Sequence, residues 1–136
     1  MSTETGLPTP APKPTSETET FWAGTAEGKL LLARCDACAT VIWYPRSFCP
    51  ACAGRSTTWI EASGRGTVYS FTIVRRGVGA YKESAPFVVA YVELEEGPRV
   101  MTNVIGDPET VEVGMAVEVV FHDTGEGSAL YRFRRV

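Results

Sequence analysis

The sequence lacks any long hydrophobic run. Its 136 residues contain no apolar stretch close to the ~18 residues that a membrane-spanning helix needs. The first residues, Met1 to Thr5, have neither the positive charge nor the apolar core of a secretory signal peptide. We therefore expect a soluble, cytoplasmic protein with no membrane partner. The length favours a single domain, or a small module attached to one.

Positive charge is also in short supply. Thirteen Lys and Arg residues stand against 16 Asp and Glu, so the net charge is −3, which disfavours nucleic acid as a partner. The only histidine, His122, lies at the end of a predicted strand beside Asp123, with no positioned Ser, Cys or second carboxylate, and we interpret it as a surface residue. The sequence has no G-x-S-x-G or P-loop motif. It therefore predicts no catalytic residues.

The N-terminal segment is rich in proline and poor in apolar residues. Four of the nine prolines lie at positions 8, 10, 12 and 14, and we predict that residues 1–16 are an extended, mobile linker. A short helix is predicted over residues 17–28, because Ser16 and Glu19 have capping-box spacing and Gly28 is a suitable stop. Its aromatic pair, Phe21 and Trp22, is typical of a packing face, within the chain or onto a partner.

The rest of the chain has the pattern of β structure. Residues 29–57 contain short strand-like runs around the cysteines, and residues 58–136 begin with a short run at 58–61. Five further runs are rich in β-branched and aromatic residues: 66–74, 87–94, 99–104, 116–121 and 130–133. A turn at 95–98 predicts that the second and third of these form a hairpin. Because no long helical period intervenes, we predict a mostly β protein whose residues 58–136 form a five-stranded barrel of the OB type.

The four cysteines form two C-x-x-C pairs separated by ten residues. Cys35 with Cys38, and Cys49 with Cys52, are spaced to place two sulfurs each on one metal ion, so we predict a structural four-thiolate zinc site. The compartment disfavours disulfides, and a thioredoxin-like motif would need a single pair in a βαβ setting. Ala39 and Ala53 stand where such metal-binding turns often have glycine. Residues 29–57 have too few apolar residues to fold by burial, so metal binding is expected to stabilise this segment.

Arginines cluster at two places in the predicted barrel. Arg75 and Arg76 end the first long strand, before the loop Gly77-Val78-Gly79, and in a barrel they could meet Arg132, Arg134 and Arg135 near one rim. Guanidinium groups suit bidentate phosphate contacts. We interpret the three C-terminal arginines as ordinary surface charge, and phosphate binding and surface charge remain equally good interpretations of the Arg75-Arg76 pair.

The order of these parts resembles the acyl-CoA-associated family that joins a rubredoxin-like zinc ribbon to an OB-fold. The likeness covers residues 17–136. It is carried by the following motifs: Phe21-Trp22, Gly28-Lys29-Leu30, Cys35-Asp36-Ala37-Cys38, Tyr44-Pro45-Arg46, Phe48-Cys49-Pro50-Ala51-Cys52, the segments 63–70 and 86–90, and Gly114-Met115. The resemblance implies that the four cysteines are zinc ligands. It also implies a linker at residues 1–16, so we hypothesise that the chain is the released or separately encoded counterpart of a domain fused to a hydratase elsewhere.

The resemblance implies a non-catalytic accessory subunit. Its partner would be a thiolase-like enzyme, above all a lipid-transfer-protein-type aldolase or thiolase that cleaves a steroid-type side-chain acyl-CoA, in a hetero-oligomer around a partner dimer. Phe21 and Trp22 are then candidate interface residues, and Arg75 and Arg76 are candidate contacts to the CoA phosphates. One alternative is a partner domain of a MaoC-like enoyl-CoA hydratase. Another is an OB-fold that binds single-stranded nucleic acid, which the absence of a basic face with interleaved aromatics disfavours.

Overall fold

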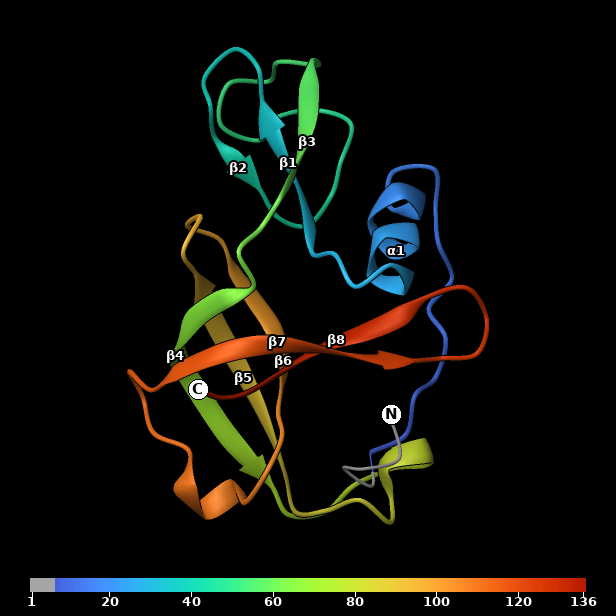
Figure 1. Cartoon of the computed structure of the whole chain (residues 1–136), viewed down its shortest axis with the longest axis vertical. Helices are drawn as coiled ribbons and strands as arrows, with labels where there is room; N and C mark the ends of the chain where they lie inside the picture. The colour runs from blue at the N-terminus through green and yellow to red at the C-terminus, as the bar shows by residue number, and fades with distance from the viewer. Residues whose placement is uncertain (1–6) are drawn as a thin grey trace.

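A computed structural model describes residues 7–136 as one short helix, a small sheet and a barrel (Figure 1). Helix α1 spans Glu19–Ala26. The small sheet has strands β1 (Leu31–Cys35), β2 (Val41–Ile42) and β3 (Thr57–Glu61) in the order β2-β1-β3, all antiparallel. This sheet and the loops that carry the four cysteines are called the ribbon below.

The barrel is closed by five strands, as predicted. They are β4 (Arg65–Val74), β5 (Phe87–Leu94), β6 (Arg99–Val104), β7 (Ala116–Asp123) and β8 (Ala129–Arg135), in the order β4-β5-β6-β8-β7. Strands β5 and β6 form the predicted hairpin. The β4–β5 and β6–β7 connections contain the 3-10 helices η2 (Gly79–Tyr81) and η3 (Pro108–Thr110). Strands β6 and β8 pair in parallel at Val104 and Phe133, and the Thr102 hydroxyl donates to the carbonyl of Tyr131 at 3.0 Å beside this pair.

The structure adds detail to two predicted elements. The run at 58–61, predicted to open residues 58–136, forms β3, which pairs with β1 over five residues, and its Trp59 packs against both the barrel core and the ribbon core. Helix α1 lies within the predicted 17–28, but the capping box does not form. Its N-cap is Thr18, which has no side-chain capping bond and whose hydroxyl instead accepts a hydrogen bond from the Thr15 N–H at 2.8 Å.

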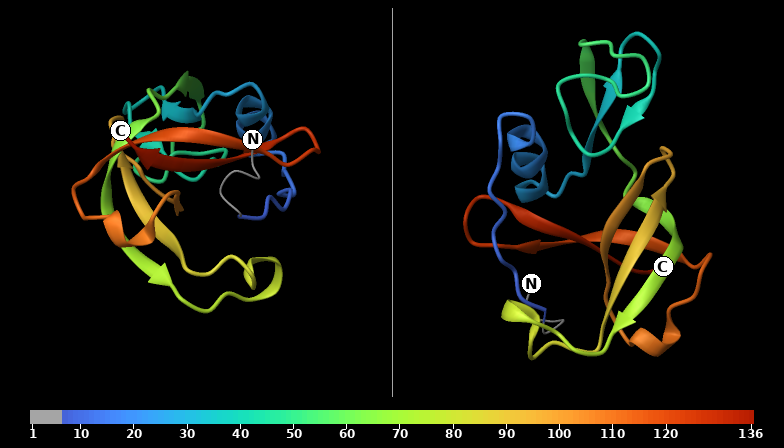
Figure 2. Two further views of the ribbon diagram at one scale, coloured as in Figure 1. Left: turned by 60° about the horizontal axis from the view of Figure 1, so that its bottom comes forward. Right: turned by 180° about the vertical axis from the view of Figure 1, so that it is seen from behind.

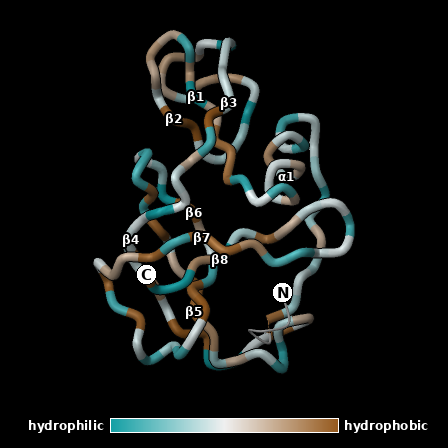
Figure 3. Tube along the Cα trace, viewed as in Figure 1, coloured by the Kyte–Doolittle hydropathy of each residue, from teal (hydrophilic) through white to brown (hydrophobic). Residues whose placement is uncertain are grey.

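The apolar residues gather in two cores of very different size. In the barrel, buried valines alternate along the strands and meet Phe133, which has no exposed surface. Figure 3 shows hydrophobic segments along these strands and polar segments in the connecting loops. The second core, within the ribbon, contains Ala33, Cys35, Ile42 and Cys49 with the half-buried Trp59 packed against them, whereas Leu32 of β1 is buried in the first core. The ribbon therefore has little apolar burial to stabilise it.

A cluster of aromatic rings joins the ribbon, the helix and the barrel. Phe21 of α1 lies 5.3 Å from Trp43 of the ribbon and 5.7 Å from Tyr131 of β8, measured between ring centroids. Trp22 donates a hydrogen bond from Nε1 to the hydroxyl of Tyr44 at 3.2 Å. Phe21 and Trp22 were expected at a partner interface, but they are 0% and 8% exposed. This corrects the interface assignment for Phe21, because internal packing covers its whole ring.

The segment before α1 lies against the barrel rather than apart from it. Residues 7–16 have no helix or strand and run from α1 down to the loop that contains η2 (Figure 2). Leu7 is buried, and the carbonyl of Pro8 accepts a hydrogen bond from Arg132 Nη2 at 2.7 Å. The described part of the predicted mobile linker is thus docked at its start, and the remainder of that linker, residues 1–6, lies outside the described residues.

Candidate metal centre and apolar pocket

The four cysteine sulfurs lie within 4.8 Å of one another. The Sγ–Sγ distances are 3.6 Å for both Cys35–Cys52 and Cys38–Cys49. A tetrahedral zinc ion with Zn–S bonds of about 2.3 Å needs sulfurs about 3.8 Å apart, so the cage has the size of a zinc site. The four ligands fill a tetrahedral shell and leave no position for water or substrate. The centre is a structural zinc site, and its predicted ligands are brought together as expected.

The backbone turns that present the sulfurs explain the two unusual alanines. Ala39 and Ala53 have φ angles of 66° and 65°, in the left-handed region that favours glycine. Their N–H groups donate to the carbonyls of Cys35 and Cys49 at 2.9 and 2.8 Å, which closes each turn around its pair of ligands. The sequence pattern therefore identified these turns correctly, and the alanines hold a conformation that glycine would adopt at lower cost.

The thiols of Cys38 and Cys52 have pKa shifts in opposite directions. The Thr40 hydroxyl, 3.0 Å from Cys38 Sγ, lowers the pKa of this thiol to about 6. At Cys52 the N–H of Gly54 acts to lower the pKa, but the crowded sulfurs of Cys35 and Cys38 raise it, and the net result is a pKa of about 12. Four thiolates this close repel one another unless a cation lies between them. Binding zinc is what makes all four deprotonated at once.

Asp36, next to the first ligand, ties the metal-binding loop to β3. Its carboxylate accepts hydrogen bonds from the hydroxyls of Ser56 at 2.6 Å and Thr58 at 2.7 Å. These two bonds lower the pKa of Asp36, with Ser56 the larger cause. The carboxylate is therefore charged at neutral pH and fixes the loop to the strand behind it.

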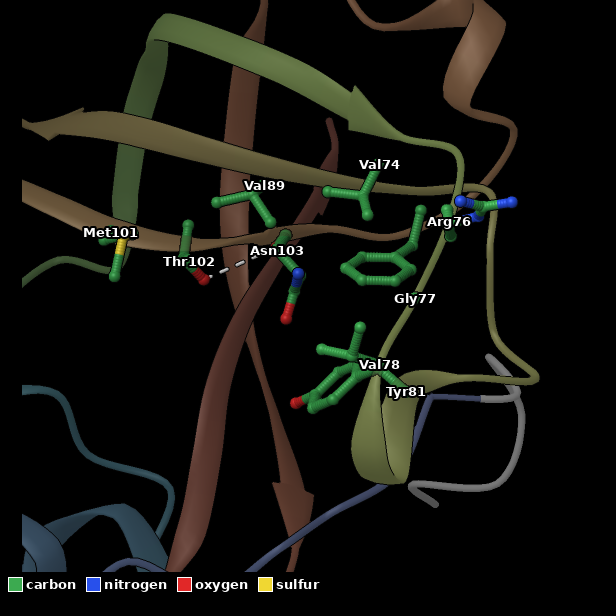
Figure 4. A pocket seen from close by; sticks show the side chains of 10 residues that line it. Val74, Arg76, Gly77, Val78, Tyr81, Val89, Met101, Thr102 and Asn103 are labelled. Carbon is green, nitrogen blue, oxygen red and sulfur yellow. Dashed lines mark hydrogen bonds between the residues drawn. The ribbon is translucent and has the colours of Figure 1, made fainter.

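The barrel carries an apolar pocket of about 360 Å³ beside the β4–β5 loop (Figure 4). It is lined by Val74, Arg76, Gly77, Val78, Tyr81, Phe87, Val89, Met101, Thr102 and Asn103. Arg76 stands at one end of it, whereas Arg75 forms an exposed ion pair with Glu109 at 3.1 Å. Of the two predicted phosphate contacts, the structure thus brings one to a pocket and engages the other elsewhere.

The arginines suggested to meet near one rim have different partners. Arg75 and Arg135 both bond to η3, Arg75 to Glu109 at 3.1 Å and Arg135 to the carbonyl of Thr110 at 2.7 Å. Arg134 pairs with Glu118 at 2.8 Å. Arg132, interpreted as surface charge, is 1% exposed, and His122, also expected on the surface, is 4% exposed. Both predictions were wrong for one reason. The loop containing Tyr81 and the segment at Pro8 cover one face of β8. The sequence of β8 alone does not predict that this face is covered.

The buried guanidinium of Arg132 replaces the expected surface charge with an internal network. Its Nη1 lies 2.9 Å from Nδ1 of His122. Its Nη2 donates to the carbonyl of Pro8 and, at 3.1 Å, to the hydroxyl of Tyr81. Because a guanidinium only donates, Nδ1 of His122 must accept, which leaves the ring proton on Nε2. In the described part of the chain, the histidine and the cysteines are therefore all engaged in structural contacts.

None of the helices within residues 7–136 is long and apolar enough to cross a membrane.

A short helix followed by a four-cysteine ribbon and a five-stranded closed barrel defines a zinc-ribbon/OB-fold protein. Residues 22–58 match the family described as "ChsH2, rubredoxin-like zinc ribbon domain", and residues 59–122 match "ChsH2, C-terminal OB-fold domain". The chain belongs to this ChsH2 (DUF35) family, which confirms the resemblance found in the sequence.

Relatives of known description fall into two groups. A "DUF35 domain-containing scaffold protein" of Methanocaldococcus jannaschii is 37% identical over 112 residues, which cover 77% of this chain and 79% of the relative. A "probable enoyl-CoA hydratase alpha subunit" of Thermomonospora curvata is 39% identical over 99 residues, covering 71% of this chain but 31% of the relative. The "3-oxo-4,17-pregnadiene-20-carboxyl-CoA hydratase alpha subunit" of Mycobacterium tuberculosis is 32% identical, covering 82% of this chain and 36% of the relative.

A solved structure matches nearly the whole chain. It is described as "Ltp2-ChsH2(DUF35) aldolase", with a TM-score of 0.82 and 32% identity, and the match covers 92% of this chain and 98% of the other. This protein is thus similar in length and fold to that chain, and similar to about a third of each hydratase subunit.

Proposed function

We propose that this protein is a non-catalytic accessory subunit that binds and supports a thiolase-like acyl-CoA enzyme. The observation that carries the proposal is the end-to-end similarity to the chain of the Ltp2-ChsH2(DUF35) aldolase. The closed metal shell supports it, because a four-thiolate zinc site stabilises a fold and does not activate substrate. The engagement of His122 with Arg132 supports it too, because the described residues then offer no free histidine base.

The finer proposal concerns the partner and its chemistry. We favour a lipid-transfer-protein-type enzyme that cleaves a carbon–carbon bond of a β-hydroxy- or β-keto-acyl-CoA, by retro-aldol cleavage or thiolysis, in the cytoplasm. The name of the Mycobacterium tuberculosis relative supports a steroid-type side chain as the acyl group. The subunit would sit in a hetero-oligomer around a partner dimer, and the partner would supply the catalytic residues.

The apolar pocket is the part of this chain that we assign to the acyl-CoA channel. Its walls are aliphatic and aromatic, and Val78 and Met101 at its margin are 78% and 56% exposed, which suits contact with a partner or an acyl chain. Arg76 would contact a CoA phosphate at the end of the pocket. Arg75 is the weaker of the two predicted contacts, because Glu109 already holds its guanidinium.

A second candidate partner is a MaoC-like enoyl-CoA hydratase. The specific observation in its favour is that this chain is similar to about a third of two hydratase alpha subunits. In that case the same surface would serve a hydratase and not an aldolase. The two candidates differ in the reaction that addition of this chain stimulates.

The test is co-expression and co-purification with a thiolase-like enzyme from the same gene neighbourhood, followed by aldolase, thiolase and hydratase assays with and without this chain. We expect a stable complex, and aldolase activity that depends on this subunit. An unchanged activity and no co-purification would contradict the proposal, and stimulation of hydratase activity would favour the second candidate. Within the complex, Arg76→Ala should raise the KM for acyl-CoA several-fold, whereas Arg134→Ala, an exposed control on β8, should not.

A further inference from the structure

Arg132 is a buried cation that joins parts of the chain far apart in sequence. From β8 it reaches the carbonyl of Pro8 in the segment before α1, the hydroxyl of Tyr81 in η2 and Nδ1 of His122 in β7. These residues are up to 124 positions away in the sequence. A buried guanidinium is costly unless its donors are satisfied, and these three partners satisfy donors on both of its terminal nitrogens. Burial lowers the pKa of Arg132, and the contact with Tyr81 opposes this.

Tyr81 connects this network to the apolar pocket. Its ring is one wall of the pocket and lies 5.3 Å, centroid to centroid, from Phe87, another lining residue. Figure 4 shows Tyr81 and Val78 facing Thr102 and Asn103 across the pocket. The same Tyr81 hydroxyl is held by Arg132. The position of this wall therefore depends on a residue that does not itself line the pocket.

The loop that carries Tyr81 is folded tightly on itself. A Cβ atom placed on Gly77 would lie 2.1 Å from the carbonyl oxygen of Tyr81. The backbone of the loop closes at this point, so Tyr81 cannot move without the rest of the loop, including Val78 on the pocket margin. A change at the Tyr81 hydroxyl is consequently passed to the pocket as a movement of its whole outer wall.

We propose that Arg132 is a positioning residue that holds the docked N-terminal segment and the Tyr81 wall of the pocket in one arrangement. Docking of Pro8 and placement of Tyr81 are then coupled, because both draw on the same Nη2 group. Release of the segment loosens the wall, and displacement of the wall loosens the segment, as reciprocal coupling requires. The coupling is a property of the free chain, and only its consequence for acyl-CoA binding rests on the proposed function.

The first measurement is ¹⁹F NMR of the free, zinc-loaded chain labelled with 3-fluorotyrosine. Tyr81→Phe identifies the Tyr81 resonance, and Tyr69, which is 48% exposed on the barrel, is the internal reference. We expect Arg132→Met to move the Tyr81 resonance towards that of free fluorotyrosine and to leave Tyr69 unchanged. Arg132→Lys, which can reach fewer partners than arginine, should give an intermediate shift. An unmoved Tyr81 resonance in folded Arg132→Met protein would overturn the proposal.

The second measurement changes the Tyr81 wall and observes the N-terminal segment. It tests the proposal even if Arg132→Met does not fold. Tyr81→Phe removes only the hydroxyl that Arg132 holds, and ¹⁵N relaxation then follows the amides of Thr9 and Ala11 in the docked segment. We expect their order parameters to fall from about 0.8 towards about 0.6. Tyr69→Phe, the same change at an exposed ring, is the matched control and should have no effect. Equal order parameters in the two variants would contradict the coupling, whether or not a partner enzyme is ever found.

Discussion

The ribbon is an antiparallel sheet and the barrel is antiparallel except between β6 and β8, but different interactions stabilise the two regions. The barrel has five strands and a core of buried valines around Phe133. The ribbon has three short strands, and its own apolar cluster contains four residues, two of which are metal ligands. The barrel can fold by removing apolar surface from water, whereas the ribbon needs the metal to offset the entropy of ordering its loops.

Buried side chains therefore have different roles in the two regions. Phe133 is buried in the large apolar core, whereas Cys49 is buried in the small ribbon cluster and is also a metal ligand. The aromatic cluster around Phe21 is a place where the two kinds of stabilisation meet. The following predictions separate the regions or test how strongly the cluster joins them, from the largest expected effect to the smallest.

Removal of zinc should have the largest effect, and it should be confined to the ribbon. Cys49→Ser takes a fully buried ligand from a site whose metal contributes on the order of 10 kcal/mol to folding. We expect loss of bound zinc and rapid hydrogen exchange in β1–β3, with protection retained in the barrel ladder. Metal analysis and hydrogen exchange by mass spectrometry check this. Ala51→Ser, an exposed change between two ligands, is the control. Simultaneous loss of protection in both regions would show that they form one cooperative unit.

Truncation of a side chain in the barrel core should lower the stability of the barrel and leave zinc binding by the ribbon unchanged. Phe133→Ala leaves a cavity at a side chain with no exposed surface and should lower the free energy of unfolding by about 3–5 kcal/mol. Zinc content at room temperature should not change, because no ligand or metal-binding turn is touched. Urea unfolding and metal analysis measure the two quantities. Phe48→Ala, at a ring that is 41% exposed, should cost far less. Zinc loss in Phe133→Ala would mean that the ribbon depends on the barrel.

Loss of packing in the aromatic cluster should change the stability of the ribbon relative to that of the barrel. Phe21→Leu keeps an apolar side chain but removes the ring that touches Trp43 and Tyr131, and should cost about 1–2 kcal/mol. Differential scanning calorimetry should then show the ribbon and barrel transitions farther apart than in the parent protein. Tyr91→Leu, at a ring that is 47% exposed on the barrel, is the control. Unchanged separation would indicate that other contacts join the regions.

The smallest predicted effect is an increase in the stability of the metal-bound ribbon. Ala39→Gly and Ala53→Gly remove the penalty for a left-handed backbone, less the entropy that glycine loses, and each should add about 0.5–1 kcal/mol to the metal-bound state. Competition with a chromophoric chelator should show about 2–5-fold tighter zinc binding. Ala37→Gly, in the same loop but without a positive φ, should weaken binding slightly. Weaker binding in the first two variants would contradict the role assigned to these turns.

The sequence predicted those features that depend on local spacing. The two C-x-x-C pairs fixed the metal ligands, and the alternating runs predicted the five barrel strands and the β5–β6 hairpin, because each pattern reports on neighbours a few residues apart. The short run at 58–61 was predicted as a strand, but its pairing with β1 was not, since strand propensity does not say which sheet a strand joins.

Features that depend on distant segments could not be predicted in this way. Arg132 alternates with Tyr131 and Phe133 as an outward residue of a half-buried strand would, and the pattern does not show that Pro8 and Tyr81 cover that side. His122 was misjudged for the same reason, because its environment is set by Arg132 on the neighbouring strand. The sequence also indicated arginines near a loop, but not that Glu109 would engage one of them.

The aromatic cluster has an optical consequence. All three tryptophans of the chain, Trp22, Trp43 and Trp59, lie in α1 or the ribbon, and the barrel strands contain none. Indole fluorescence of the unmodified protein therefore reports on the metal-dependent half and its junction, while the barrel is silent. A chelator titration, or the docking of another protein against the ribbon, can be followed without attaching a dye.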